Sequence, residues 1–258
     1  MSCGKYADKR KACRETWAAL KQPNVSVVFF SGKSEPSEPD LITLSAPDDY
    51  MSCAEKVGEF FRWALLQVGW EWLVKCDDDT YLDIERLEDL IKGMDVNSFA
   101  GNDHIFKKSG FAGGGSGYIL HRGIIENMVN DDYPIKKGYE DRIISSKAIK
   151  HGAVPWPTKR LWYCKSIIPT SRNDQVTCHR VKPHEMRAIH SIRHFPELMR
   201  LPVVNSAWAD TLVFYHGGGF QQLNRLACGA FEQMENHIIL RWFEWPVEKL
   251  SREWVCHK

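Results

Sequence analysis

The chain has 258 residues, enough for one large α/β domain or one domain with a small appendage. With 34 basic and 33 acidic residues, its net charge of +1 argues against a general nucleic-acid-binding protein, which normally carries a clear basic excess. No apolar run approaches the ~20 residues that span a bilayer, and the eight cysteines include no C-x-x-C pair of the kind that builds a zinc ribbon.

Helices and strands are predicted to alternate from the beginning of the chain. Residues 8–21 predict a helix with an apolar inner face. The β-branched and aromatic residues 25–30 predict the first core strand, and Ser31-Gly32 predicts a turn at its carboxyl end. A second short strand is expected at residues 41–44.

The alternation continues through two amphipathic helices. Ser52 and Glu55 have the spacing of a capping box, and Asp83 is placed to cap the second helix. The alternation over residues 25–91 predicts a mostly parallel sheet covered on both faces. The expected buried face of the first of these helices comprises Val57, Phe60, Phe61, Ala64, Leu65 and Val68.

An acidic triplet, Asp77, Asp78 and Asp79, directly follows the predicted buried strand at residues 72–74. Three adjacent carboxylates repel one another, so a folded chain keeps them together only where a cation or strong donors offset their charge. Mg²⁺ and Mn²⁺ prefer oxygen ligands, and ligands of open α/β sheets bind beyond the carboxyl ends of strands. The triplet therefore predicts a divalent-metal site; the alternative is a solvated acidic turn that caps the next helix.

Glycine dominates residues 111–117 (FAGGGSG), just before a predicted strand at residues 118–120. Glycines let the backbone approach a sugar or a diphosphate closely and expose N–H groups to it. The run lacks the terminal Lys-Ser/Thr of a phosphate-binding loop, and it does not open the first helix as a dinucleotide-binding fingerprint does. A flexible turn is the alternative interpretation.

A second acidic pair, Glu140-Asp141, begins a helix that we expect over residues 142–151, closed by Gly152. A carboxylate at a helix start is stabilised by the helix dipole, and a helix cap is the simpler interpretation. The alternative is a general base, held near a cleft with its proton-accepting face outward.

Four histidines lie around a strand predicted at residues 176–179 and a helix that begins at Pro183. A lone histidine is more often a hydrogen-bonded or surface residue than a ligand. Imidazole suits Mn²⁺ less than oxygen does, so one histidine beside carboxylates is the most that we expect at a metal site.

The character of the chain changes near residue 205, and we expect a main domain at residues 1–204 and a small β-rich appendage at residues 205–258 packed on it. Residues 211–223 predict a hairpin, and residues 238–245 (IILRWFEW) predict a strand rich in aromatic residues. These aromatic residues favour a core or an interface; a sugar-stacking surface is the alternative.

Six segments, taken in order, resemble the β1,3-glycosyltransferase family that includes the β1,3-galactosyltransferases, the N-acetylglucosaminyltransferases and Fringe. Residues 10–17 (RKACRETW) are similar to its R-x-A-I-R-x-T-W signature, and residues 75–81 (KCDDDTY) match its K-x-D-D-D-x-[FY]. Asp49-Tyr50 with Lys56 resembles its D-x-Y…L-T-x-K stretch, although Ser52-Cys53-Ala54 replaces the usual N-L-T.

The remaining three segments follow in the same order. Residues 112–120 (AGGGSGYIL) resemble A-x-G-G-G-Y-[VI]-L with Ser116-Gly117 inserted, and Glu140-Asp141 matches an E-D pair at a helix start. Residues 179–186 (HRVKPHEM) resemble H-x-V-x-P-x-x-M. The resemblance covers roughly two-thirds of the chain and leaves out the C-terminal appendage.

The resemblance implies a GT-A fold, an α/β Rossmann-like glycosyltransferase domain, with a nucleotide-diphospho-sugar donor, a divalent metal and inversion at the anomeric carbon. Asp79 would bind the metal together with Asp77 and His179, and Asp141 would be the general base. The implied donor-binding residues are Asp77, Asp78, Arg10, Arg14, Phe30, Ser31, Lys75, Gly114 and Gly115. The candidate acceptor-binding residues are Tyr118, Glu140 and Trp162.

The expected function is an inverting transferase that moves galactose, N-acetylglucosamine or xylose from a UDP-sugar to a glycan hydroxyl. Mn²⁺ or Mg²⁺ would offset the charge that develops on the diphosphate, and a carboxylate would deprotonate the acceptor. One alternative is a non-catalytic nucleotide- or carbohydrate-binding relative, which the retained Asp141 disfavours. The other is a metal-dependent phosphohydrolase or nuclease, which the near-neutral charge disfavours.

Location and specificity follow less directly from these residues. The chain opens on a polar segment rather than on an apolar signal, so we expect a soluble, cytoplasmic protein. Many members of the family are membrane-anchored Golgi enzymes, so the Golgi lumen is the alternative if an anchor was removed. The residues specify neither the donor sugar nor the acceptor, and they leave the oligomeric state open.

Overall fold

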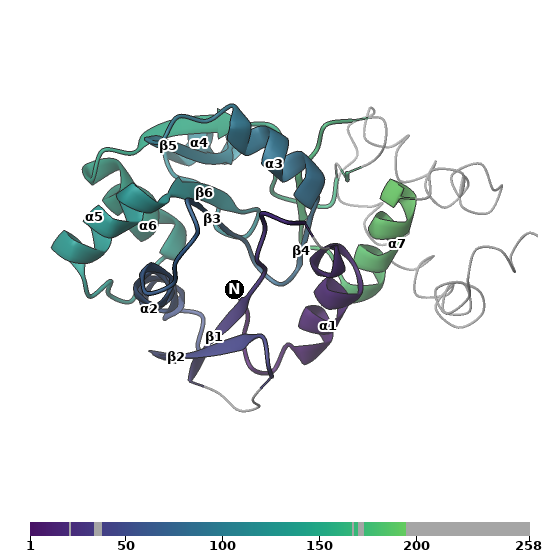
Figure 1. Ribbon diagram of the computed structural model, residues 1–258, viewed down its shortest axis with the longest axis horizontal. Helices are drawn as coiled ribbons and strands as arrows, with labels where there is room; N and C mark the ends of the chain where they lie inside the picture. Colours follow the sequence, from purple (N-terminus) through teal and green to yellow (C-terminus); the bar gives the residue numbers. More distant parts are fainter. Residues whose placement is uncertain (21, 34–37, 167, 170–172, 195–258) are drawn as a thin grey trace, which may run out of the picture. The chain divides into compact units, whose positions relative to one another are not determined.

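The computed structural model describes residues 1–20, 22–33, 38–166, 168–169 and 173–194, and this part is mixed α/β. Helices α2, α5 and α6 pack against one another beside the central strands, and α1 packs against α7 (Figure 1). The helical elements are α1 (Ala7–Glu15), the 3₁₀ turn η1 (Trp17–Ala19), α2 (Cys53–Leu65), α3 (Ile84–Lys92), α4 (Asp103–Ser109), α5 (Arg122–Asp132), α6 (Glu140–Lys150) and α7 (Pro183–His194).

The described strands form three sheets. The central sheet has the strand order β3-β6-β5-β7, a second sheet has the order β4-β9-β8, and β1 pairs with β2 alone. The strands are β1 (Phe29–Lys33), β2 (Leu41–Pro47), β3 (Trp72–Lys75), β4 (Thr80–Leu82), β5 (Ser98–Asn102), β6 (Tyr118–His121), β7 (Val154–Thr158), β8 (Leu161–Trp162) and β9 (Thr177–His179).

The central sheet is mixed, whereas the sequence predicts a mostly parallel one. Strand β6 runs antiparallel to both of its neighbours, β3 and β5, and only β7 joins β5 in parallel. The strands β1 and β2 are parallel to each other, but as a separate pair. The strand–helix alternation that suggests parallel strands ends before β5, so it carries no information on the direction of β6.

Two local features near the beginning of the chain differ from the prediction. Helix α1 ends at Glu15, because the Thr16 hydroxyl donates to the Ala12 carbonyl at 2.7 Å and the chain turns into η1. Ser31-Gly32 lies within β1 rather than in a turn after it. A Cβ on Gly32 would lie 2.6 Å from the carbonyl carbon of Pro47, so a glycine there allows β1 to approach β2.

Helix α2 begins at Cys53, as the sequence predicts, but without a capping box. The Ser52 side chain makes no cap hydrogen bond; its hydroxyl donates instead to Asp49 Oδ2 at 2.9 Å. The helix also ends at Leu65, which leaves Val68 94% exposed, so the prediction of Val68 in the core is wrong. The predictions of α3, β6, α6 and α7 are confirmed, including the Asp83 side chain that accepts from the Arg86 amide.

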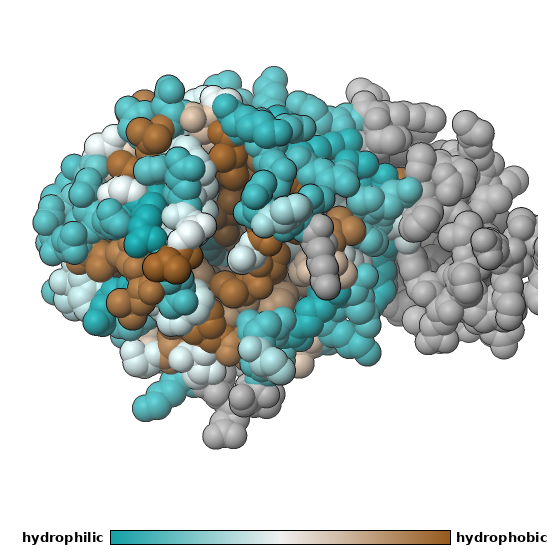
Figure 2. All heavy atoms as spheres, in the orientation of Figure 1, coloured by the Kyte–Doolittle hydropathy of each residue, from teal (hydrophilic) through white to brown (hydrophobic). Residues whose placement is uncertain are grey.

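The main hydrophobic core lies between the central sheet and helices α2, α5 and α6. Phe30 of β1 stacks on Phe60 of α2 with ring centroids 4.1 Å apart, and Phe99 of β5 meets Tyr118 of β6 edge to face at 5.8 Å. Each such side chain contributes about 1.5–3 kcal/mol when it is fully buried. In the space-filling view, hydrophobic residues gather around a hollow near the start of the chain (Figure 2).

The predicted hairpin at residues 211–223, the predicted strand at residues 238–245 and the expected domain boundary near residue 205 lie outside the described residues. Within the part of the chain that the structure describes, every helix is too short or too polar to cross a bilayer.

Candidate functional site

The glycine run and the acidic triplet meet at the carboxyl end of β3. Lys75, the last residue of β3, pairs in register with Tyr118, the first residue of β6. The Gly115 carbonyl accepts from the Thr80 hydroxyl at 2.7 Å and from the Asp77 amide at 3.4 Å. The loop that precedes β6 is therefore fastened to the loop that follows β3, and the two loops form one face of the site.

Asp77, Asp79 and His179 form the one cluster among the described residues that could hold a metal ion, and we call it the candidate metal-ligand cluster. Strand β9 pairs antiparallel with β4, which places His179 opposite Thr80 and beside the triplet. One ligand atom from each of the three side chains lies within 4.8 Å of the other two, and His179 Nε2 is 3.1 Å from Asp79 Oδ1. All three side chains are half-buried, so they are both fixed and accessible.

The geometry of these three side chains fits a hard divalent ion. Two ligand atoms that each bind one ion at about 2.1 Å, at right angles to each other, lie about 3 Å apart. This is close to the 3.1 Å between His179 Nε2 and Asp79 Oδ1. His179 Nδ1 is 3.3 Å from the Tyr163 carbonyl, and a proton on Nδ1 would leave Nε2 free to bind an ion in place of its hydrogen bond to Asp79. Two carboxylates and one imidazole are a donor set that Mn²⁺ accepts, with room for phosphate oxygens.

The carboxylates of the cluster are kept ionised. Burial acts to raise the pKa of Asp79, but the hydrogen bond and charge of His179, together with Lys9, outweigh it and hold the pKa at about 2. Burial also acts to raise the pKa of Asp77, and Lys75 is the largest of the influences that outweigh it and lower the pKa. Both ligands are therefore anionic over the whole neutral range.

Asp78 takes no part in the metal-ligand cluster. Its side chain is buried, with one oxygen 2.6 Å from the Ser2 hydroxyl and the other 3.4 Å from Lys9 Nζ. Burial raises the pKa of Asp78, although Ser2 and Lys9 oppose the shift. In this structure Asp78 fastens the first residues of the chain and α1 to the site, and a donor-binding role stays a prediction.

Lys75 is a buried cation that joins the two acidic groups of the site. Its Nζ lies 2.9 Å from Asp77, 3.1 Å from the Gly114 carbonyl and 3.5 Å from Glu140. Burial acts to lower the pKa of Lys75, but Asp77 and Glu140 outweigh it and raise the pKa. A buried ammonium with three oxygen partners is a fixed positive charge at the centre of the site.

Asp141 lies on the other side of the glycine loop from the metal-ligand cluster. Its Oδ1 accepts from the Gly114 amide at 2.8 Å, which holds the half-buried carboxylate at the start of α6. Its neighbour Glu140 is buried and accepts from the Tyr118 hydroxyl at 2.7 Å. Burial raises the pKa of Glu140 to about 8, with Asp141 adding to the effect and Lys75 opposing it.

Gly114 and Gly115 allow these acidic groups to approach the loop. A Cβ on Gly114 would lie 2.5 Å from Asp141 Oδ1, and a Cβ on Gly115 would lie 2.8 Å from His179 Nδ1 and closer still to other ring atoms. Real Cβ atoms essentially never approach another atom closer than 3.0 Å. Glycine is therefore required at both positions by close packing, and the run is more than a flexible turn.

The expected donor-binding residues at the start of the chain make contacts elsewhere. The Arg10 guanidinium is buried and bonds to Glu38 at 2.5 Å, and Arg14 reaches both Glu38 and Asp40. Phe30 and Ser31 are buried in β1. These residues hold the first helix and strand together in this structure, and contact with a donor stays a prediction.

The three expected acceptor-binding residues differ in their access to solvent. Tyr118 and Glu140 are buried and bonded to each other, which makes them a support beneath Asp141 rather than an open surface. Trp162 is half-buried in β8, and its ring nitrogen donates to the Ser166 hydroxyl at 2.5 Å. Its neighbour Tyr163 stacks on His104 with ring centroids 5.3 Å apart.

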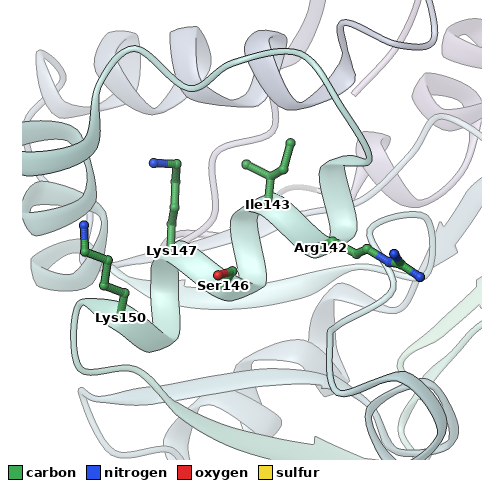
Figure 3. Close-up of a pocket in the computed structure, with 5 residues that line it drawn as sticks. All are labelled: Arg142, Ile143, Ser146, Lys147 and Lys150. Carbon is green, nitrogen blue, oxygen red and sulfur yellow. The ribbon is translucent and has the colours of Figure 1, made fainter.

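A shallow hollow elsewhere on α6 contains none of the acidic residues of the site (Figure 3). Its lining is basic and polar, with no carboxylate or candidate nucleophilic cluster, and we assign it no chemistry. The lining residues are Arg142, Ile143, Ser146, Lys147 and Lys150.

Three residues at the site carry no signal in the sequence. Lys9 lies 3.2 Å from Asp79, Thr80 donates to the glycine loop, and the Tyr163 carbonyl orients His179. Lys9 and Tyr163 are far from the triplet along the chain, and only folding brings them to it. A comparison with models of known protein families found none that matches this chain.

Proposed function

We propose that this chain is an inverting, divalent-metal-dependent glycosyltransferase of the GT-A type, which transfers a sugar from a UDP-sugar to a hydroxyl of a glycan acceptor. One observation carries the proposal. Two glycines lie between the candidate metal-ligand cluster and a carboxylate: Gly115 packs against His179, and Gly114 donates to Asp141 at 2.8 Å. The resemblance of six ordered motifs to the β1,3-glycosyltransferases supports the same function.

Direct displacement at an anomeric carbon needs two such centres. The acceptor oxygen forms a bond to the anomeric carbon while the bond to the diphosphate oxygen breaks and its electron pair leaves with UDP. A divalent ion, when bound, offsets the negative charge that develops on the diphosphate. Asp77, Asp79 and His179 would hold this ion, and Asp141 would take the proton from the acceptor hydroxyl.

Glu140 and Lys75 would support these steps without reacting. A Glu140 pKa of about 8, raised mainly by burial, favours the protonated form of this carboxyl at neutral pH. The fixed charge of Lys75 lies between Asp77 and Glu140 and would offset the negative charge that gathers on both sides of the loop.

The proposal is tested by UDP release from UDP-galactose, UDP-N-acetylglucosamine and UDP-xylose, with Mn²⁺ and with chelator. We expect metal-dependent hydrolysis of at least one donor. Asp79→Ala should abolish it while the protein stays folded, and Asp89→Asn, a surface carboxylate change on α3, should leave it intact. Equal rates for wild type and Asp79→Ala would remove the triplet from the chemistry.

The role of Asp141 has a separate test. Asp141→Asn should reduce the rate of UDP release from the sugar donor by at least a factor of about 100. Binding of UDP with Mn²⁺ should be unchanged. Loss of UDP binding in this variant would contradict the assignment of Asp141 as the base. His179→Ala should weaken Mn²⁺ binding, and an unchanged metal requirement would exclude His179 from the site.

The second candidate is a non-catalytic nucleotide- or carbohydrate-binding relative. The buried cations and half-buried carboxylates of the site would also suit a protein that only holds UDP. Binding of UDP with Mn²⁺, without hydrolysis or transfer of any of the three donors, would favour this candidate over the transferase.

A further inference from the structure

Two tyrosines, Tyr50 and Tyr139, are unusually exposed for large aromatic side chains. Tyr50 is 78% exposed and Tyr139 is 64% exposed, whereas Tyr81 and Tyr118 are fully buried. The two exposed rings come from different parts of the chain, the loop after β2 and the loop before α6.

These two loops are fastened to each other. The Gly138 amide donates to the Met51 carbonyl at 3.1 Å, and Lys137 Nζ lies 3.6 Å from Asp49 Oδ2. Asp49 also accepts from the amide and the hydroxyl of Ser52, so the first loop is held at the start of α2. Tyr50 and Tyr139 each adjoin a residue of this contact along the chain, so their backbones lie close together.

The second loop leads directly to Asp141. Tyr139 is the N-cap residue of α6, and the next two residues are Glu140 and Asp141. The Arg142 guanidinium lies 6.0 Å from the Tyr139 ring and 5.6 Å from the ring of Phe111, which begins the glycine run. Arg142 points away from Lys147 and Lys150, at the end of α6 where Asp141 lies (Figure 3). Aromatic and guanidinium groups therefore lie at the end of α6 that carries Asp141.

We infer that Tyr50 and Tyr139 form an acceptor subsite that binds a pyranose ring of the acceptor; this inference rests on the proposed function. The face of a tyrosine ring packs against the C–H face of a sugar, while its hydroxyl and the nearby Arg142 offer hydrogen bonds to sugar hydroxyls. The position fits an acceptor, because the base must face the attacking hydroxyl.

The composition of this surface favours a sugar over a second protein. Met51 is the only other large apolar side chain of the two loops with high exposure in the described chain, at 48%, and charged Lys137 and Arg142 flank the rings. A stable protein interface needs ~800 Å² from each partner with an apolar centre, more than two rings and one methionine supply. A single pyranose ring needs no larger surface than this.

The test measures glycoside binding by saturation-transfer NMR in the presence of UDP and Mn²⁺, with methyl β-galactopyranoside and methyl β-N-acetylglucosaminide as probes. At least one glycoside should bind to the wild type. Tyr139→Ala and Tyr50→Ala should each weaken it by about tenfold, and Tyr139→Phe should recover most of the binding. Leu66→Ala, which removes an exposed side chain at the end of α2, should have no effect.

Donor hydrolysis by the same proteins separates the two proposals. Metal-dependent UDP-sugar hydrolysis by the wild type, together with the loss of glycoside binding in both alanine variants, supports the subsite. Two results would overturn the subsite and leave the proposed function standing. In the first, the wild type hydrolyses a donor but binds neither glycoside. In the second, the wild type hydrolyses a donor and both alanine variants still bind the glycoside. A concentration-dependent dimer that Tyr139→Ala abolishes would also overturn the subsite, whereas absence of hydrolysis of every donor would count against the proposed function.

Discussion

Substitution of Gly115 by alanine tests whether the glycine loop positions the metal-ligand cluster. The added Cβ would lie 2.8 Å from His179 Nδ1, and the two other nearby ring atoms would be closer. Ordinary van der Waals contact begins at 3.4 Å, so the imidazole must retreat by about 1 Å or the loop must move away from Asp77 and Thr80.

The size of the effect follows from this displacement. Overpacking of a tight site lowers the free energy of unfolding by about 1–3 kcal/mol, which is less than the total stability of a typical domain. A shift of about 1 Å in a ligand or a catalytic group costs on the order of 100-fold in rate. Gly115→Ala should therefore remain folded and lose most of its affinity for Mn²⁺ in the presence of UDP, with a similar loss of donor hydrolysis.

The assay is a titration of Mn²⁺ into protein and UDP, followed by calorimetry, beside a thermal melt of each variant. The matched control is Gly93→Ala at the end of α3, where the nearest atom to the new Cβ is 3.6 Å away. The control should bind Mn²⁺ as the wild type does. Wild-type affinity in Gly115→Ala would show that the loop does not constrain His179, and the reasoning from close packing would fail.

Two further predictions concern ion pairs. Lys75→Met should lower the free energy of unfolding by about 3–5 kcal/mol in urea unfolding, because it leaves Asp77 and the buried Glu140 without their cation. The control Lys92→Met, at an exposed pair, should change it by less than about 0.5 kcal/mol. The Glu38 pKa is about 2, because the hydrogen bond from Arg10 outweighs burial, so its stabilising contribution is complete above pH 4.5 and is lost as the pH falls toward 2. Glu38→Gln should flatten the loss of stability between pH 4.5 and 2, and an unchanged acid profile would contradict the assignment.

The chemistry of the site was more predictable than its construction. Residue type alone pointed to the triplet at residues 77–79 as candidate ligands, because adjacent carboxylates need a cation, and it did not separate Asp78 from the other two. Their proximity to His179 depends on the pairing of β4 with β9. The position of Asp141 beside the glycine loop depends on its hydrogen bond from the Gly114 amide. Such long-range contacts have no periodic signature, so the sequence suggested them only through resemblance.

The fold was predictable where one element supplied its own signal. The apolar spacing in α2 and α3 and the Asp83 cap were sufficient to place those helices. The capping box is absent, and the Ser52 hydroxyl instead bonds to Asp49, a contact that spacing does not reveal. The direction of β6 is set by its two partner strands, so neither its composition nor its neighbours along the chain determined it.

The most direct test of the proposed site is the position of a bound ion in crystals grown with Mn²⁺ and UDP. The anomalous signal of manganese should lie within bonding distance of Asp79 and His179, with the diphosphate on its open side and Asp141 free of the metal. A manganese peak away from these side chains, in crystals that also contain UDP, would contradict the account.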